Sequence, residues 1–192
     1  SVEEKWFKVR EQLNPTEFLG YEFDKAEGIV LKISKENKFV ENAKEGDEVE
    51  VITNQTPFYG ESGGQVGDQG IISNSKCKIN IQDTQKKMGD LFVHYGTVQK
   101  GTFAVGDSVN LEINIQKRNN ARANHSATHL LHEALRRTLG KHVTQKGSLV
   151  SPDRLRFDFS HSKPIEKDEV VKINKIVNEI VNGASDVQTR IM

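Results

Sequence analysis

Glu27-Gly28-Ile29-Val30-Leu31-Lys32-Ile33 is the stretch that decides the fold of the first half of the chain. It has the strand-like alternation and the β-branched content of a strand with one buried face. Five further runs of this kind follow, separated by Gly, Asn or Asp turns, at 48–52, 70–72, 77–81, 91–98 and 108–115. Strands at this spacing predict a small closed β-barrel, because closure leaves no exposed strand edge.

Turns and helices flank these strands. Gly46-Asp47 and Gly106-Asp107 each precede a Val-rich strand, and we predict that they form turns of similar design. Residues 2–13 predict a helix that ends before a proline and closes a preceding region. After Pro164, apolar residues at helical spacing predict a second helix over 165–180, which Gly183 ends.

The composition limits the class of protein. A chain of 192 residues with 35% hydrophobic content allows one or two domains with modest cores and no membrane segment. Its single cysteine, Cys77, excludes a disulfide framework within the chain and fits a reducing cytosol, so we expect a cytoplasmic protein without a membrane partner. Because Cys77 lies in a predicted strand with no histidine beside it, we expect a buried or half-buried residue and no metal ligand.

Two histidines carry the strongest local signal. His125-Ser126-Ala127-Thr128-His129 lies in a predicted helix over roughly residues 121–139, and four residues advance a helix by about 400°, so both imidazoles leave one face. They could bind one metal ion, with His132 about 20° from His125 as a competitor. A zinc site needs three or four ligands, and the alternative is that these histidines are core or solvated residues. Ser126 in place of glutamate argues against a metalloprotease.

Charge is distributed unevenly along the chain. Residues 1–116 hold 13 Lys/Arg against 19 Asp/Glu, a balance of −6, whereas residues 117–163 hold 10 against 3, a balance of +7. Such a local excess favours a phosphate-rich ligand, although each residue alone could belong to a solvated helix face. The candidates for RNA binding are Arg122, Arg136, Arg137, Lys146 and Arg156, together with Lys117, Arg118, Lys141 and Arg154.

Four sequence blocks resemble those of one enzyme family. They are Phe58-Tyr59-Gly60-Glu61-Ser62-Gly63-Gly64-Gln65, His125-Ser126-Ala127-Thr128-His129-Leu130-Leu131-His132, Gln145-Lys146-Gly147-Ser148-Leu149-Val150 and Leu155-Arg156-Phe157-Asp158-Phe159-Ser160-His161. In this order and at this spacing they resemble blocks of the alanyl-tRNA synthetase family. The resemblance covers about residues 14–192.

The resemblance implies an α+β fold. Residues 1–13 would form a helix that ends a preceding region, residues 14–116 a small β-barrel resembling those of translation factors, and residues 117–192 the N-terminal half of a truncated α/β editing domain. The chain would then be an internal fragment of the synthetase.

The resemblance also implies cofactors and partners. The family's editing zinc is held by the H-x-x-x-H pair, here His125 and His129, and by a later C-x-x-x-H that this chain does not contain. We therefore expect the chain to bind zinc weakly or not at all. The ATP and magnesium of the aminoacylation reaction belong to a domain outside the chain, and the expected partners are tRNA(Ala) and the rest of the synthetase.

The loop Gly60–Gly70 is rich in glycine, so its backbone can approach a ligand closely. Gly63-Gly64-Gln65 resembles the tripeptide with which release factors hydrolyse peptidyl-tRNA esters. Gln65 is therefore a candidate catalytic residue, with Gly63 and Gly64 as substrate-binding candidates beside the tRNA end. The alternative is a tight connection between barrel strands.

The resemblance points to hydrolysis of seryl- and glycyl-tRNA. An apolar pocket shaped for alanine cannot exclude glycine and discriminates a hydroxyl by only about 1–3 kcal/mol. A second site can instead bind the serine hydroxyl, and Gln145 is the candidate catalytic and substrate-binding residue, with Thr144 and Ser148 beside it. The alternative for Gln145 is a surface amide.

Three functions stay open on the sequence. The first is a fragment of alanyl-tRNA synthetase with half of the editing site, inactive alone. The second is a free-standing deacylase of the same superfamily, which would not need the helix at residues 2–13. The third is a tRNA-binding module without chemistry.

Overall fold

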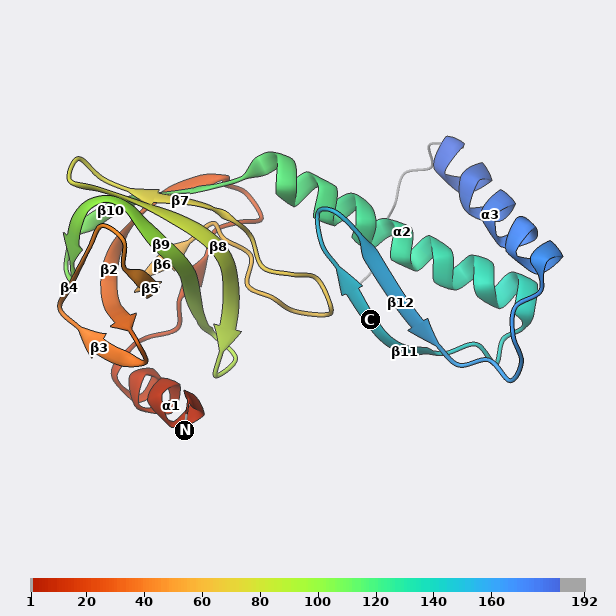
Figure 1. Cartoon of the computed structure of the whole chain (residues 1–192), viewed down its shortest axis with the longest axis horizontal. Helices are drawn as coiled ribbons and strands as arrows, with labels where there is room; N and C mark the ends of the chain where they lie inside the picture. Colours follow the sequence, from red (N-terminus) through yellow and green to blue (C-terminus); the bar gives the residue numbers. More distant parts are fainter. Residues whose placement is uncertain (1, 184–192) are drawn as a thin grey trace. The chain divides into compact units, whose positions relative to one another are not determined.

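The computed structural model describes residues 2–183, which form two compact units that divide the chain between Asn119 and Asn120. The first unit holds helix α1 (Val2–Gln12), strands β1 to β10 and the start of helix α2 (Ile115–Leu139) (Figure 1). The second holds the rest of α2, strands β11 (Gln145–Val150) and β12 (Leu155–Phe159), and helix α3 (Lys167–Asn182).

A closed antiparallel barrel forms the first unit. Its strands are β2 (Lys25–Lys35), β5 (Glu48–Thr53), β7 (Gly70–Ser73), β8 (Cys77–Lys87), β9 (Leu91–Ala104) and β10 (Ser108–Ile113). They follow the order β10-β7-β8-β9-β5-β2, and β10 pairs with β2 to close the ring, with Leu111 opposite Ala26. Five of the six predicted runs lie within these strands, and the sixth, at 108–115, runs two residues past the end of β10. The predicted α+β fold with a small closed barrel is confirmed.

Four short strands lie outside the six-strand ring. β1 (Glu17–Phe18) pairs in parallel with β6 (Gln55–Thr56), β3 (Lys38–Val40) extends the sheet beside β2, and β4 (Asn42–Lys44) pairs with β9. Strands of two or three residues are too short to show a period, so the sequence did not predict them.

Apolar side chains fill the barrel and fasten α1 to it. The interior includes Val30, Ile33, Val51, Ile72, Ile79, Ile81, Val98 and Leu111, all at most 1% exposed. A second cluster packs Trp6 and Val9 of α1 with Ile52, Leu91 and Val93 of the barrel. The predicted helix over residues 2–13 is therefore present, and it docks through one apolar face.

The two predicted Gly-Asp turns share one design. Gly46 and Gly106 have φ of 88° and 92°, which glycine adopts without a steric penalty. Asp47 accepts the Lys44 amide at 3.0 Å, and Asp107 accepts the Ala104 amide at 2.9 Å. The prediction of similar turns is confirmed.

Helix α2 begins earlier than the sequence predicted. The prediction placed Ile115 in a strand and started the helix near residue 121, whereas β10 ends at Ile113 and α2 starts at Ile115. Asn114 caps the helix, because its Oδ1 accepts the Lys117 amide at 3.0 Å. Apolar alternation runs on through Ile115, so periodicity alone could not locate this boundary.

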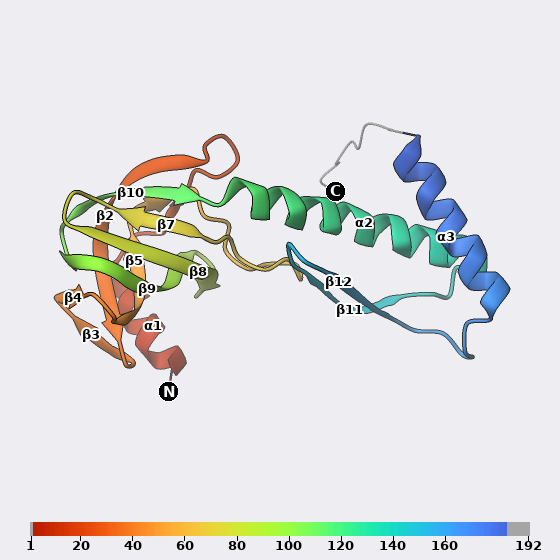
Figure 2. The same cartoon turned by 45° about the horizontal axis from the view of Figure 1, so that its top comes forward.

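The second unit packs α2, the β11–β12 hairpin and α3 around a small core. Its buried members are Ala134, Leu135, Val143 and Ile173. A capping box between Glu166 and Glu169 starts α3. The helix ends at Asn182 before Gly183, as predicted, although Gly183 has a right-handed φ of −75°. Figures 1 and 2 both show the hairpin running alongside α2.

Two further predictions concern burial and membranes. Cys77 is buried at the start of β8, as expected, and this burial raises the pKa of its thiol. Within residues 2–183, no helix is both long enough and apolar enough to cross a membrane.

One histidine is buried in the barrel wall. His94 is 0% exposed, and its Nδ1 lies 2.8 Å from the Val51 carbonyl, so Nδ1 carries the donated proton. Its Nε2 therefore accepts from the Thr56 hydroxyl at 2.8 Å, and the ring packs edge-on against Phe58. Both nitrogens of the neutral ring are satisfied, and burial lowers the pKa of His94 to about 4.

We predict that His94 makes the barrel less stable in acid. Because the pKa of His94 is about 4 in the folded state and ordinarily 6.5, its contribution to stability is complete above about pH 6.5 and is lost as the pH falls through 4. The full loss is about 3 kcal/mol, since one pKa unit is about 1.4 kcal/mol. Denaturant unfolding of the native chain and of His94→Gln at pH 7 and pH 5 measures this term. An equal loss in both proteins would contradict the prediction.

Candidate functional site

The histidine pair lies on α2, with His125 half-buried and His129 exposed. His125 and His129 bring their Nε2 atoms to 3.1 Å, as expected for residues one helical turn apart. Desolvation, and secondarily repulsion from His129, lowers the pKa of His125. Lowering the pKa favours the neutral ring, which is the form that binds a metal.

This pair fits one part of a zinc site. Two ligands at about 2.0–2.1 Å from a tetrahedral zinc lie about 3.3 Å apart, close to the observed separation. The Nδ1 atom of His125 is buried without a hydrogen-bond partner among the described residues. In residues 2–183, no group of three His, Cys, Asp or Glu side chains is arranged to hold a metal ion. Among the described residues, His125 and His129 therefore have the spacing of two ligands of a tetrahedral site.

The other histidines of this unit have different surroundings. The ring of His132 packs against Phe157 with centroids 5.2 Å apart, and its Nε2 is buried without a hydrogen-bond partner in the part of the chain that is described. His142 Nε2 lies 2.9 Å from His161 Nδ1, with the two rings stacked. Neither His132 nor His161 joins the pair as a third ligand.

The hairpin brings together two of the three candidate serine-binding residues. Gln145 Nε2 donates to Ser148 Oγ at 3.2 Å across a bulge in β11. Thr144 lies apart from this contact, because its hydroxyl is 2.7 Å from that of Ser160. Gln145 is exposed, so its amide is accessible to a ligand. The roles of Gln145, Thr144 and Ser148 stay predictions.

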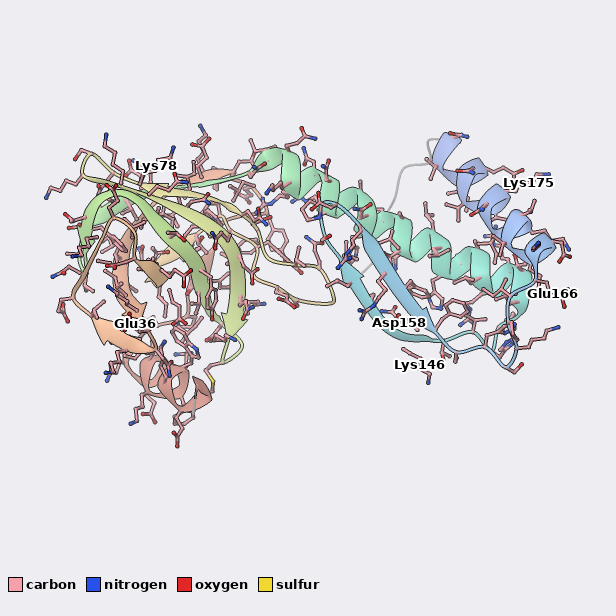
Figure 3. The ribbon with its side chains drawn as sticks, in the orientation of Figure 1. Glu36, Lys78, Lys146, Asp158, Glu166 and Lys175 are labelled. Carbon is pink, nitrogen blue, oxygen red and sulfur yellow. The ribbon has the colours of Figure 1, made fainter. Side chains whose placement is uncertain are left out.

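Three of the five basic candidates for RNA binding contact other groups of the chain, and the other two are exposed. Arg137 pairs with Glu133 at 2.8 Å, Arg156 lies 3.2 Å from Asp158, and Arg136 donates to the Val143 carbonyl at 3.3 Å. Arg122 and Lys146 are exposed. Figure 3 shows Lys146 and Asp158 on the two strands of the hairpin. These five residues remain candidates for RNA binding.

Arg118 is a correction to the wider list of basic candidates, because it is buried in the first unit. Its Nε donates to Asp68 at 2.9 Å, its NH1 to the Gly20 carbonyl at 2.9 Å and its NH2 to the Pro57 carbonyl at 2.5 Å. Asp68 also accepts the Tyr59 amide at 2.8 Å. Arg118 therefore fixes both ends of the glycine-rich loop and is not available to a phosphate.

A tight turn explains why two positions of that loop, Gly63 and Gly64, are glycine. Ser62 and Gln65 exchange backbone hydrogen bonds at 3.0 and 3.2 Å around Gly63 and Gly64, whose φ values are 58° and 82°. Two positive φ values define the tightest hairpin turn, which favours glycine at both positions. The tight-connection interpretation accounts for Gly63 and Gly64, and the catalytic role of Gln65 stays a prediction.

Sequence reasoning missed Asn124 and the His142–His161 pair. Asn124 donates to the Ser151 carbonyl at 2.7 Å and lies 3.4 Å from that of Pro152, so α2 holds the hairpin turn. No local signal marks these residues, because each contact joins two elements far apart in the sequence.

Two comparisons with known proteins point to the same kind of protein. Residues 1–117 match the family described as tRNA synthetases class II (A). The chain is 55% identical over 192 residues to an alanine–tRNA ligase of Chelativorans sp. (strain BNC1) and 56% identical to one of Mesorhizobium japonicum. An alanine–tRNA ligase of Rhodopseudomonas palustris is 53% identical. All of the chain is covered, and it spans 22% of the length of each relative.

We predict that the chain does not retain stoichiometric zinc. Two neutral imidazoles leave the remaining coordination positions to water, so affinity stays low. Atomic emission analysis after dialysis against a mild chelator should find well under one zinc per chain, with His125→Ala as the control for background. One zinc per chain that is lost in His125→Ala would contradict the prediction.

We also predict salt-dependent RNA binding through the segment 117–163. Replacing Arg136 and Arg137 together by Ala should weaken tRNA binding and reduce the slope of log affinity against log salt by about 1 to 2, because each phosphate contact releases counterions. Filter binding at several salt concentrations measures the slope. Lys172→Ala with Lys175→Ala removes the same charge from α3 and should leave the slope unchanged. Equal slopes for both double variants would exclude Arg136 and Arg137 from the interface.

Proposed function

The chain belongs to the family of class II tRNA synthetases (A), and we propose that it is a segment of a cytoplasmic alanine–tRNA ligase that carries part of an editing site. The complete enzyme would join alanine to tRNA(Ala) with ATP and magnesium in a domain outside this segment. The editing site would hydrolyse seryl- and glycyl-tRNA(Ala). One observation carries this proposal: a close imidazole pair on α2, in the same unit as a hairpin that offers the Gln145 amide.

Binding energetics explain why such an enzyme needs a second site. A pocket that accepts alanine also accepts glycine, and an apolar pocket rejects the serine hydroxyl only weakly. Hydrolysis of the wrong ester at a separate site restores fidelity, provided that this site recognises what alanine lacks. A hydrogen-bonding group that the bound substrate covers and leaves unpaired costs about 1–3 kcal/mol, which penalises alanine and favours serine.

Gln145 would recognise the serine hydroxyl. Its Nε2 already donates to the Ser148 hydroxyl at 3.2 Å, so a substrate hydroxyl can take the place of that contact with the same geometry. Thr144 and Ser148 would complete the polar surface. Hydrolysis adds water to the ester carbonyl, breaks the bond to the ribose oxygen and leaves the proton on that oxygen.

His125 and His129 would supply two zinc ligands, and the others would come from the rest of the ligase. Zinc held there would provide Lewis-acid chemistry at the ester. The basic residues Arg122, Arg136, Arg137, Lys146 and Arg156 would bind the tRNA backbone. The turn that carries Gly63, Gly64 and Gln65 would border the acceptor end of the tRNA.

We predict different effects of two substitutions in the complete ligase, one on the rate of editing and one on its selectivity. His125→Ala should abolish hydrolysis of seryl-tRNA and leave alanine activation intact, because activation occurs in a separate domain. Gln145→Ala should lower the ratio of seryl- to alanyl-tRNA hydrolysis by about 10-fold, the equivalent of one lost hydrogen bond. Gln99→Ala, an exposed glutamine of β9, is the matched control.

Deacylation rates with seryl- and alanyl-tRNA decide the outcome. Normal hydrolysis by His125→Ala would contradict the metal assignment. An unchanged rate ratio in Gln145→Ala would remove its role in selectivity. A free-standing deacylase would be distinguished by the mass of the native gene product, and a binding module by tRNA affinity without hydrolysis in the complete protein.

A further inference from the structure

The turn of the β11–β12 hairpin is tied to α2 by one side chain. Ser151 and Arg154 close this turn, with the Ser151 amide donating to the Arg154 carbonyl at 2.9 Å. The Asn124 amide nitrogen reaches two carbonyls of the turn, those of Ser151 at 2.7 Å and Pro152 at 3.4 Å. Asn124 directly precedes His125 in the chain.

A second contact joins the hairpin to α2 farther along both elements. Phe157 of β12 packs on His132 at a centroid distance of 5.2 Å. Ser148 is directly opposite Phe157 in the ladder, and opposite residues of an antiparallel pair share a face. Ser148, the hydrogen-bond partner of Gln145, therefore lies on the face of the hairpin that meets α2.

The imidazole pair lies between these two contacts along α2. Asn124 and His132 are eight residues apart, which is about 12 Å of helix, and His125 and His129 lie between them. On the hairpin, the distance from the turn to Ser148 is about three residues, or about 10 Å of strand. The two lengths are similar, so both contacts form between the same stretch of α2 and the same stretch of the hairpin.

The two contacts differ in what they fix. The contact between the His132 and Phe157 rings permits small shifts along α2, because it is the sum of many weak dispersion contacts. Hydrogen bonds from one amide to two carbonyls have a narrow range of distance and angle. The Asn124 contact therefore sets how far the hairpin lies along α2, and the aromatic contact sets how closely it lies.

We propose that Asn124 is a positioning residue, which sets the hairpin that carries Gln145 and Ser148 against the part of α2 that carries His125 and His129. This inference rests on the proposed editing function. Asn124 touches neither substrate nor metal in this role. It acts on hydrolysis only through the relative placement of the two groups.

The test uses the complete ligase with Asn124→Ala and with Asn124→Asp, which keeps the side-chain size and replaces the donor by an acceptor. The kcat for seryl-tRNA hydrolysis should fall about 10- to 100-fold, because displacement of about 1 Å has effects of this size. The KM for tRNA and the rate of aminoacylation should not change. Asn119→Ala, an exposed residue of the same helix, should match the native enzyme.

Hydrogen exchange supplies a second readout, in which the amides of residues 148–150 should exchange at least 10-fold faster in both Asn124 variants. A kcat within twofold of the native value would overturn the inference, and so would a fall accompanied by an equal loss of aminoacylation. His125→Ala is measured in parallel. If that variant still hydrolyses seryl-tRNA normally, the proposed function fails and the inference falls with it; if it does not, the Asn124 result decides the inference alone.

Discussion

The buried guanidinium of Arg118 is the constraint on which the glycine-rich loop of the first unit depends. A buried cation is tolerated only when its donors are paired, and here the partners are Asp68 and the carbonyls of Gly20 and Pro57. Removing one member of such a buried pair costs about 3–5 kcal/mol. Arg118 thereby holds together the segments that carry Gly20, Pro57 and Asp68. The Ser62–Gln65 turn lies in the chain between two of these fixed points, Pro57 and Asp68.

The second unit is built on weaker interactions. A two-stranded hairpin is marginally stable alone, and it gains order here by packing on α2. Its core is small, and the apolar side chains that pack against the core are only partly buried. The precision of any chemistry in this unit therefore rests on a few polar contacts such as the one between Asn124 and Ser151. Elements of this kind open locally more readily than a closed barrel does.

Structural and functional reasons coincide at several residues. Gly63 and Gly64 satisfy the positive φ values of a tight turn, which by itself would account for them. His94 is a histidine with a complete structural explanation, since both of its nitrogens are bonded and its ring is buried. His125 and His129 are different, because they are half-buried and exposed, and within residues 2–183 the hydrogen bond given for their rings joins them to each other. A functional proposal is strongest where the fold gives no other reason.

The sequence alone determined the barrel strands, the three helices, the burial of Cys77 and the imidazole pair on one helical face. These features are local, because period, turn residues and i, i+4 spacing depend on neighbours in the chain. Only the tertiary structure decided that Arg118 is buried while Lys117 beside it is exposed, that Asn124 holds the hairpin turn, and that His132 packs on Phe157. Those outcomes depend on which distant carbonyl or ring the folded chain brings within contact distance. No local sequence pattern determines which group that is.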